Sequence, residues 1–99
     1  MKENRQTIIF DSSGLTALMN ETDAFHDRAL QMSEILTDRA SWRVLLPYEI
    51  FAETVTALSK RVSREAGAKA ARAILERQSA GDFVFVEADA LVYNTNPSG

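Results

Sequence analysis

The sequence predicts an α/β protein built on a parallel sheet, and two observations lead to this fold class. Three short apolar runs occur at residues 7–10, 43–46 and 83–86, and helical segments separate them in the order β-α-α-β-α-α-β. Strands joined through helices pair in parallel, and helices cover the sheet. We therefore expect one domain over residues 1–99 with three layers (α-β-α) and three strands present.

The first strand is predicted at residues 7–10, where β-branched and aromatic side chains form a continuous apolar run. Such runs are typical of buried parallel strands. Ser12 and Ser13 follow Asp11, and both are favourable N-cap residues. We expect a short helix from about residue 14 to residue 19.

The next helix is predicted at residues 24–39, with one apolar face at helical spacing formed by Phe25, Ala29, Met32 and Leu36. The second strand, at 43–46, ends at Pro47, which suits the first turn of a following helix. That helix should cover residues 48–62, with a buried stripe at Phe51, Val55, Leu58 and Val62.

The last predicted helix covers residues 64–79, where Ser63 can cap its start and frequent alanine permits close packing. Gly81 and Asp82 break the chain before the third strand. Three strands are few for a sheet covered on both faces. We therefore expect a partial domain whose later strands and helices are missing or are supplied by a partner, which would leave the first strand as an exposed edge.

Composition limits the kinds of chemistry that the chain can perform. It has 99 residues and no cysteine, which excludes disulfides, thiolate metal sites and cysteine nucleophiles and fits a cytoplasmic location. No apolar run reaches the roughly 20 residues that span a bilayer. The net charge is −3, yet six of the eleven Lys and Arg residues lie between positions 60 and 77. That stretch is either a solvated helix face or a surface that contacts RNA phosphates.

Asp11 and Glu53 are the residues most suited to carry chemistry. Asp11 ends the first strand, and ligands of parallel sheets gather at the carboxyl ends of strands. Asp11 could instead only cap a helix, and Glu53, at the rim of the apolar arc of its helix, could be a surface residue paired with Lys60. Two carboxylates brought together favour a hard cation such as Mg²⁺ or Mn²⁺, which can polarise a phosphodiester and activate water.

His26 is the only histidine in the sequence. One histidine without cysteine supports neither a catalytic triad nor a zinc site. We expect a packing or surface role for this side chain.

Three stretches resemble the motifs of PIN-domain nucleases, including VapC-like toxins. Residues 8–15 (IIFDSSGL) resemble the opening strand, Asp and small hydroxyl residue of the family. Residues 23–29 (DAFHDRA) look like its next helix start, and residues 46–54 (LPYEIFAET) look like its second motif with an Ala-Glu pair. The order and spacing of these stretches carry the resemblance over residues 7–87.

The resemblance implies a metal-dependent endoribonuclease that cleaves single-stranded RNA with Mg²⁺ or Mn²⁺. Asp11 and Glu53 match the first two acids of the family's metal site, and Ser12 matches the hydroxyl residue that supports it. Many members are toxins neutralised by a small antitoxin, and many form dimers. Asp89 resembles the family's third acid but follows the third strand more closely than the family pattern, which usually inserts a helix.

The alternative is a non-catalytic PIN-like module that binds protein or RNA without cleaving it. A response-regulator-like domain also places acids at strand ends. It fits less well, because the first strand here is not followed by a pair of acids.

Overall fold

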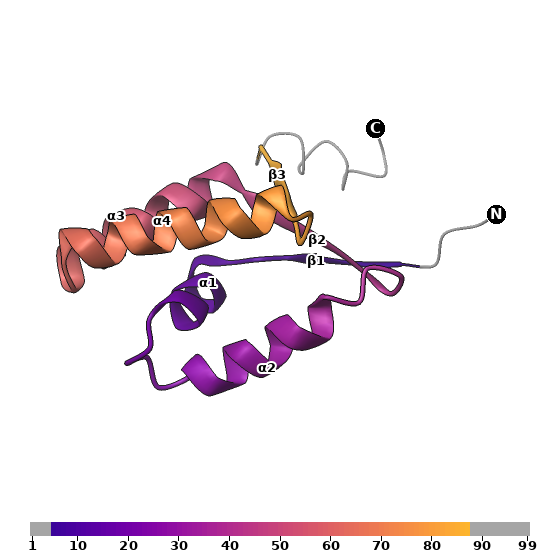
Figure 1. The fold of residues 1–99 in the computed structure, drawn as a ribbon, viewed down its shortest axis with the longest axis horizontal. Coiled ribbons are helices and arrows are strands. Elements are labelled where there is room, and N and C mark those ends of the chain that lie inside the picture. Colours follow the sequence, from indigo (N-terminus) through magenta and orange to yellow (C-terminus); the bar gives the residue numbers. More distant parts are fainter. Residues whose placement is uncertain (1–4, 88–99) are drawn as a thin grey trace, which may run out of the picture.

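Seven elements follow one another in a computed structural model of the protein, which describes residues 5–87 (Figure 1). They are β1 (Gln6–Ile9), α1 (Ser12–Met19), α2 (His26–Leu36), β2 (Trp42–Pro47), α3 (Tyr48–Arg61), α4 (Arg64–Ser79) and β3 (Val84–Val86). The order of strands and helices is the predicted one. In Figure 1, α3 and α4 run side by side, and α1 and α2 lie below them.

The three strands form one parallel sheet in the order β1-β2-β3, which confirms the predicted α/β class and leaves the finer three-layer arrangement a prediction. Ile8 pairs with Val44, and Leu45 pairs with Val84. β1 therefore forms an edge of the described sheet, and Ile9 is half-exposed, so the prediction of a buried first strand is wrong for this part of the chain.

The hydrophobic core surrounds the central strand β2, whose Leu46 is fully buried. Side chains from α1, α2, α4 and the residue before β3 pack around it, namely Leu15, Leu36, Ile74 and Phe83. Burying one such side chain stabilises the fold by roughly 1.5–3 kcal/mol. The core therefore fixes α1 and β2 relative to each other. The candidate site lies at the start of α1 and beside α3, the helix that follows β2.

The predicted apolar faces of α2 and α3 are only partly buried. Leu36 and Leu58 lie in the interior, whereas Phe25, Met32 and Val62 are more than half exposed. Val62 follows the last residue of α3, beyond the packed part of that helix. Phe25 precedes the first residue of α2, so helical periodicity does not describe where its side chain points.

α3 and α4 approach closely at Gly67. A Cβ atom at this position would lie 2.9 Å from the carbonyl oxygen of Val55 and would collide with the hydroxyl of Ser59. Ala70, one turn further along α4, is also buried. The alanine-rich sequence of α4 thus serves close helix packing, as predicted.

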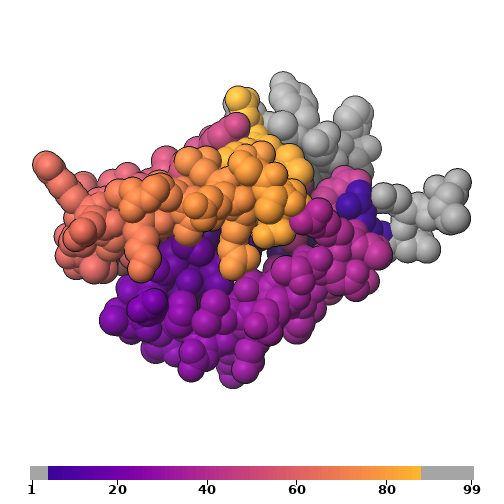
Figure 2. All heavy atoms as spheres, in the orientation of Figure 1, coloured from indigo at the N-terminus to yellow at the C-terminus, as the bar shows by residue number. Residues whose placement is uncertain are grey.

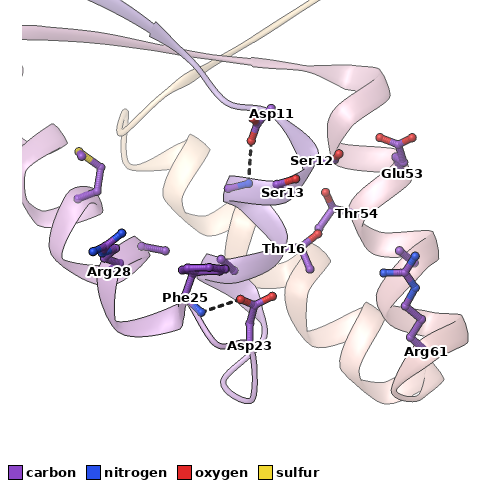
Figure 3. A pocket seen from close by; sticks show the side chains of 15 residues that line it. Asp11, Ser12, Ser13, Thr16, Asp23, Phe25, Arg28, Glu53, Thr54 and Arg61 are labelled. Carbon is purple, nitrogen blue, oxygen red and sulfur yellow. Dashed lines mark hydrogen bonds between the residues drawn. The ribbon is translucent and has the colours of Figure 1, made fainter.

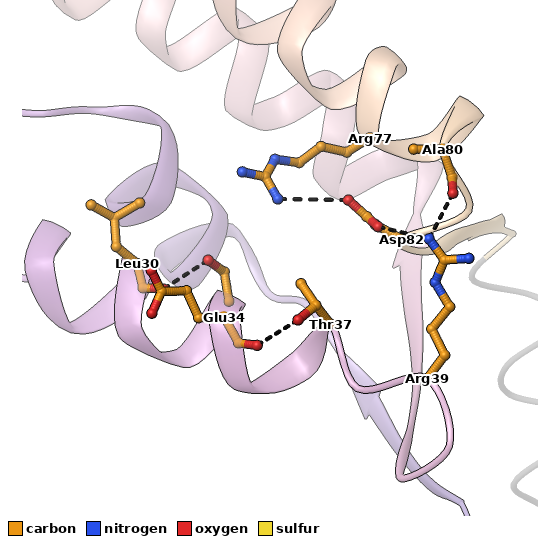
Figure 4. A network of polar contacts seen from close by, with 8 residues as sticks. Leu30, Glu34, Thr37, Arg39, Arg77, Ala80 and Asp82 are labelled. Carbon is orange, nitrogen blue, oxygen red and sulfur yellow. Dashed lines mark hydrogen bonds and ion pairs between the residues drawn. The ribbon is translucent and has the colours of Figure 1, made fainter.

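Arg39 joins the loop before β2 to the loop after α4 (Figure 4). Its Nη2 donates a 2.7 Å hydrogen bond to the carbonyl oxygen of Ala80 and lies 3.2 Å from Oδ1 of Asp82. Arg77 reaches the other carboxylate oxygen of Asp82 at 3.7 Å. Together these contacts hold the loop before β2 against the end of α4 and the loop that follows it.

Figure 2 shows a recess between α4 and α2. A small cavity of about 40 Å³ lies among these helices, α1 and β2, and its lining includes Leu18, Leu36 and Ile74. Within residues 5–87, no helix has the length and apolar character required to cross a membrane.

Candidate functional site

Asp11 is the N-cap of α1, and its Oδ1 accepts a 2.7 Å hydrogen bond from the backbone N–H of Gly14. The prediction that Ser12 or Ser13 caps a helix starting near residue 14 is therefore wrong, because α1 begins at Ser12 and both serines lie in its first turn. A Cβ at Gly14 would lie 3.1 Å from Oδ1, so the glycine leaves room for this contact.

Capping leaves the second oxygen of Asp11 available, because Oδ2 has no hydrogen-bond partner among the described residues. An ionised carboxylate has two oxygens with about four acceptor positions. The two roles considered for Asp11, helix cap and metal ligand, are therefore compatible.

Glu53 lies in the second turn of α3 with an exposed side chain. Within the described chain its carboxylate forms no hydrogen bond or ion pair, so the alternative pairing with Lys60 is not formed there. Pro47 is the last residue of β2 and the N-cap of α3. It therefore lies one residue before the first helical turn in which it was predicted.

Asp11 and Glu53 line the same open cleft, which has a volume of about 860 Å³ (Figure 3). β1 and β2 are parallel neighbours, and the N–H of Phe10 donates to the carbonyl oxygen of Leu45, 3.1 Å away, just beyond β1. Both strands therefore end at one edge of the sheet, where α1 and α3 begin and pack together. The cleft lies where ligands of parallel sheets are expected.

Four hydroxyl groups also line the cleft, from Ser12, Ser13, Thr16 and Thr54. Thr54 is 0% exposed, and its Oγ1 is buried without any hydrogen-bond partner. Buried hydroxyls normally have a partner, so this atom requires an explanation. The sequence pattern indicates that Thr54 is buried, since it is four residues from both Ile50 and Leu58 and thus lies within the apolar stripe of α3.

Two cationic side chains border the cleft, Arg28 from α2 and Arg61 from α3. Figure 3 shows them on opposite sides of α1, with Phe25 and Asp23 between them. Arg61 belongs to the basic stretch at positions 60–77, whereas Lys69 and Arg72 are exposed on α4 and line none of the described clefts. Arg28 and Phe25 were not predicted as site residues.

His26 has the packing role that the sequence predicts. Its Nδ1 lies 2.8 Å from the carbonyl oxygen of Ala17, which can only accept, so Nδ1 donates this hydrogen bond. The contact joins the start of α2 to α1 and keeps the turn at residues 20–25 beside the cleft.

The donor set of the cleft suits a hard divalent cation. Carboxylate and hydroxyl oxygens are the ligands of Mg²⁺ and Mn²⁺, whereas thiolate is absent from the chain. No cluster of three or more His, Asp or Glu side chains able to hold a metal occurs within residues 5–87. Asp89, the predicted third acid, lies outside the described residues.

The fold and the site define an α/β protein with a carboxylate-lined cleft at the end of a parallel sheet. No family model, curated protein or solved structure matches the chain. The residues of the cleft are therefore what indicates a function for this chain.

Proposed function

We propose that the protein is a metal-dependent endoribonuclease of PIN-domain type that cleaves single-stranded RNA in the cytoplasm. The observation that carries the proposal is the convergence of Asp11 and Glu53, which are distant in sequence, on one open cleft. The motif resemblance adds that the chain is the toxin of a toxin–antitoxin pair, with a small antitoxin as its partner.

Asp11 and Glu53 would hold Mg²⁺ or Mn²⁺, and the hydroxyl of Ser12 would support them. Two carboxylates suffice for such a site, because Mg²⁺ keeps several waters and commonly binds one or two carboxylates together with substrate phosphates. The bound ion would polarise the scissile phosphodiester and activate water. The exposed Glu53 and the free Oδ2 of Asp11 leave donor oxygens open to the cleft.

Calorimetric titration with Mn²⁺ tests the metal site. Asp11→Asn and Glu53→Gln should each weaken Mn²⁺ binding, because each removes one charged oxygen donor. Asparagine is as good an N-cap as aspartate, so Asp11→Asn preserves the start of α1. Glu76→Gln is the matched control, since Glu76 is exposed on α4 and away from the cleft. Unchanged Mn²⁺ affinity in both cleft variants would refute the metal site.

A labelled single-stranded RNA tests the reaction. Cleavage should require Mg²⁺ or Mn²⁺, stop in EDTA and fall in both cleft variants, while Glu76→Gln cleaves as the original protein does. Cleavage that persists in EDTA would identify a contaminating enzyme or another mechanism.

The alternative function is a non-catalytic module that binds a protein partner or a second copy of the chain. Apolar exposure favours it, since Ile9 lies on the edge strand β1 and Met32 and Ile35 are more than half exposed on α2. This alternative predicts no cleavage with any divalent ion and concentration-dependent association. Sedimentation of a stable monomer would exclude self-association.

A further inference from the structure

We propose that the cleft also holds the RNA strand itself, with an unpaired base stacked on Phe25 and flanking phosphates held by Arg28 and Arg61. This inference rests on the proposed function, because it assigns the residues that bind the substrate of the same site. None of the three residues belongs to the acidic metal site.

Phe25 is the most exposed of the large apolar residues in the described chain. Its side chain is 63% exposed and lines the cleft, and Met32 and Ala29 continue the apolar lining beside it. The carboxylate of Asp23 accepts a 2.9 Å hydrogen bond from the Phe25 N–H and so fixes the backbone that carries the ring. An exposed aromatic ring on a fixed backbone can stack on any nucleic acid base.

Stacking on Phe25 requires a base that is not already stacked in a duplex. Proteins that read single-stranded RNA splay such bases onto aromatic side chains. The cleft would therefore select single strands by the shape and chemistry of its lining.

Arg28 and Arg61 lie on both sides of that ring in Figure 3. Neither guanidinium forms an ion pair with any residue in the range 5–87, although carboxylates line the same cleft. A guanidinium can hold a phosphate with two parallel hydrogen bonds. Two such groups on helices α2 and α3 suit phosphates on either side of a stacked nucleotide.

The charges of the cleft couple RNA binding to the cation. The lining contains three carboxylates, from Asp11, Asp23 and Glu53, and two guanidinium groups, so it is negative by one charge. A divalent ion would make the balance positive and should strengthen RNA binding. In EDTA, Asp11→Asn and Glu53→Gln should also strengthen RNA binding, because each removes one repulsive charge.

Fluorescence anisotropy with a labelled, unstructured RNA measures this binding separately from cleavage. Titrations are made in EDTA, and in Mg²⁺ with a phosphorothioate backbone that slows cleavage. Phe25→Leu and Phe25→Ala should weaken binding roughly 5- to 150-fold, the range for one base stacked on an aromatic ring. Phe25→Tyr, which keeps an aromatic ring, should bind as the original protein does. Ile35→Ala is the control for an exposed apolar residue of α2 outside the cleft.

The salt dependence of the same titrations tests the arginines. Each of Arg28→Gln and Arg61→Gln should reduce the slope of log affinity against log salt by about 0.7, the value for one phosphate contact on a single strand. Arg72→Gln, on the exposed face of α4, should leave the slope unchanged. All variants are checked by circular dichroism, and their exposed side chains make loss of folding unexpected.

The outcomes separate this inference from the proposed nuclease. If Phe25→Leu binds RNA as tightly as the original protein, or if no RNA binds in either buffer, the inference is overturned even where Mn²⁺ binding depends on Asp11. If the Phe25 and arginine variants lose RNA while Mn²⁺ binding is independent of both acids, the strand-binding cleft stands and the nuclease fails. A duplex RNA that binds as well as the single strand would overturn the stacking argument.

Discussion

Replacing Thr54 by valine should stabilise the protein, because it removes a buried hydroxyl that has no hydrogen-bond partner. Thr54 is fully buried on α3, so its hydroxyl has lost water without gaining a replacement. An unsatisfied buried polar group costs about 1–3 kcal/mol. Valine has nearly the same shape and the same branching at Cβ, so helix propensity changes little.

We expect the lower part of that range, because a threonine hydroxyl in a helix can rotate toward the carbonyl of an earlier turn. A gain of about 1 kcal/mol in the free energy of unfolding would raise the melting temperature by roughly 4–8 °C for a domain of this size. Thermal and urea unfolding followed by far-ultraviolet circular dichroism measure both quantities.

Thr56→Val is the matched control for this change. Thr56 lies on the same helix, but its side chain is exposed, so its hydroxyl is already hydrated. Its replacement should alter the free energy of unfolding by no more than about 0.5 kcal/mol. If Thr54→Val lowers the stability instead, the Thr54 hydroxyl has a hydrogen-bond partner in solution and is not an unsatisfied buried group.

Two further substitutions test the helix packing and the loop contact. Gly67→Ala should lower the free energy of unfolding by about 1–2 kcal/mol, because overpacking against the Val55 carbonyl at 2.9 Å outweighs the higher helix propensity of alanine. Urea unfolding measures this loss. A more stable variant would show that α3 and α4 are further apart. Arg39→Gln should cost about 0.5–1 kcal/mol, because its partly exposed ion pair with Asp82 is screened by water. That loss should shrink at high salt, and a salt-independent loss would contradict an electrostatic contribution.

The arrangement of strands, and the position of Asp11 and Glu53 on one cleft, could be predicted largely from connectivity. Parallel strands end at one edge of their sheet, so an acid after β1 and an acid near the start of the helix after β2 lie at the same edge, where both line one cleft. The apolar runs also located all three strands of the described chain to within one or two residues.

The positions of Phe25 and of the N-cap could not be predicted from periodicity. Phe25 fits the spacing of the α2 face, but it precedes the first residue of that helix. The hydrogen bond from its backbone N–H to the Asp23 carboxylate fixes its backbone there. Asp, Ser and Thr are all favourable N-caps, and residues 11–13 offer three such candidates in a row. The hydrogen bond from the Gly14 N–H to the Asp11 carboxylate shows that Asp11 is the one used.

Several residues that break the ordinary rules of folding line one cleft, while exposed apolar residues such as Ile35 and Val84 also occur outside it. Thr54 is buried without a partner, Phe25 exposes an aromatic ring, and Arg28 and Arg61 line a cleft with carboxylates but form no ion pairs in the described chain. The core around Leu46, by contrast, is apolar, and Arg39 and Arg77 are paired with Asp82. Local violations of sequence–structure consistency are expected where a protein binds or reacts. An unpartnered buried hydroxyl and an exposed aromatic ring in the cleft that Asp11 and Glu53 line therefore support a functional cleft independently of the motif resemblance.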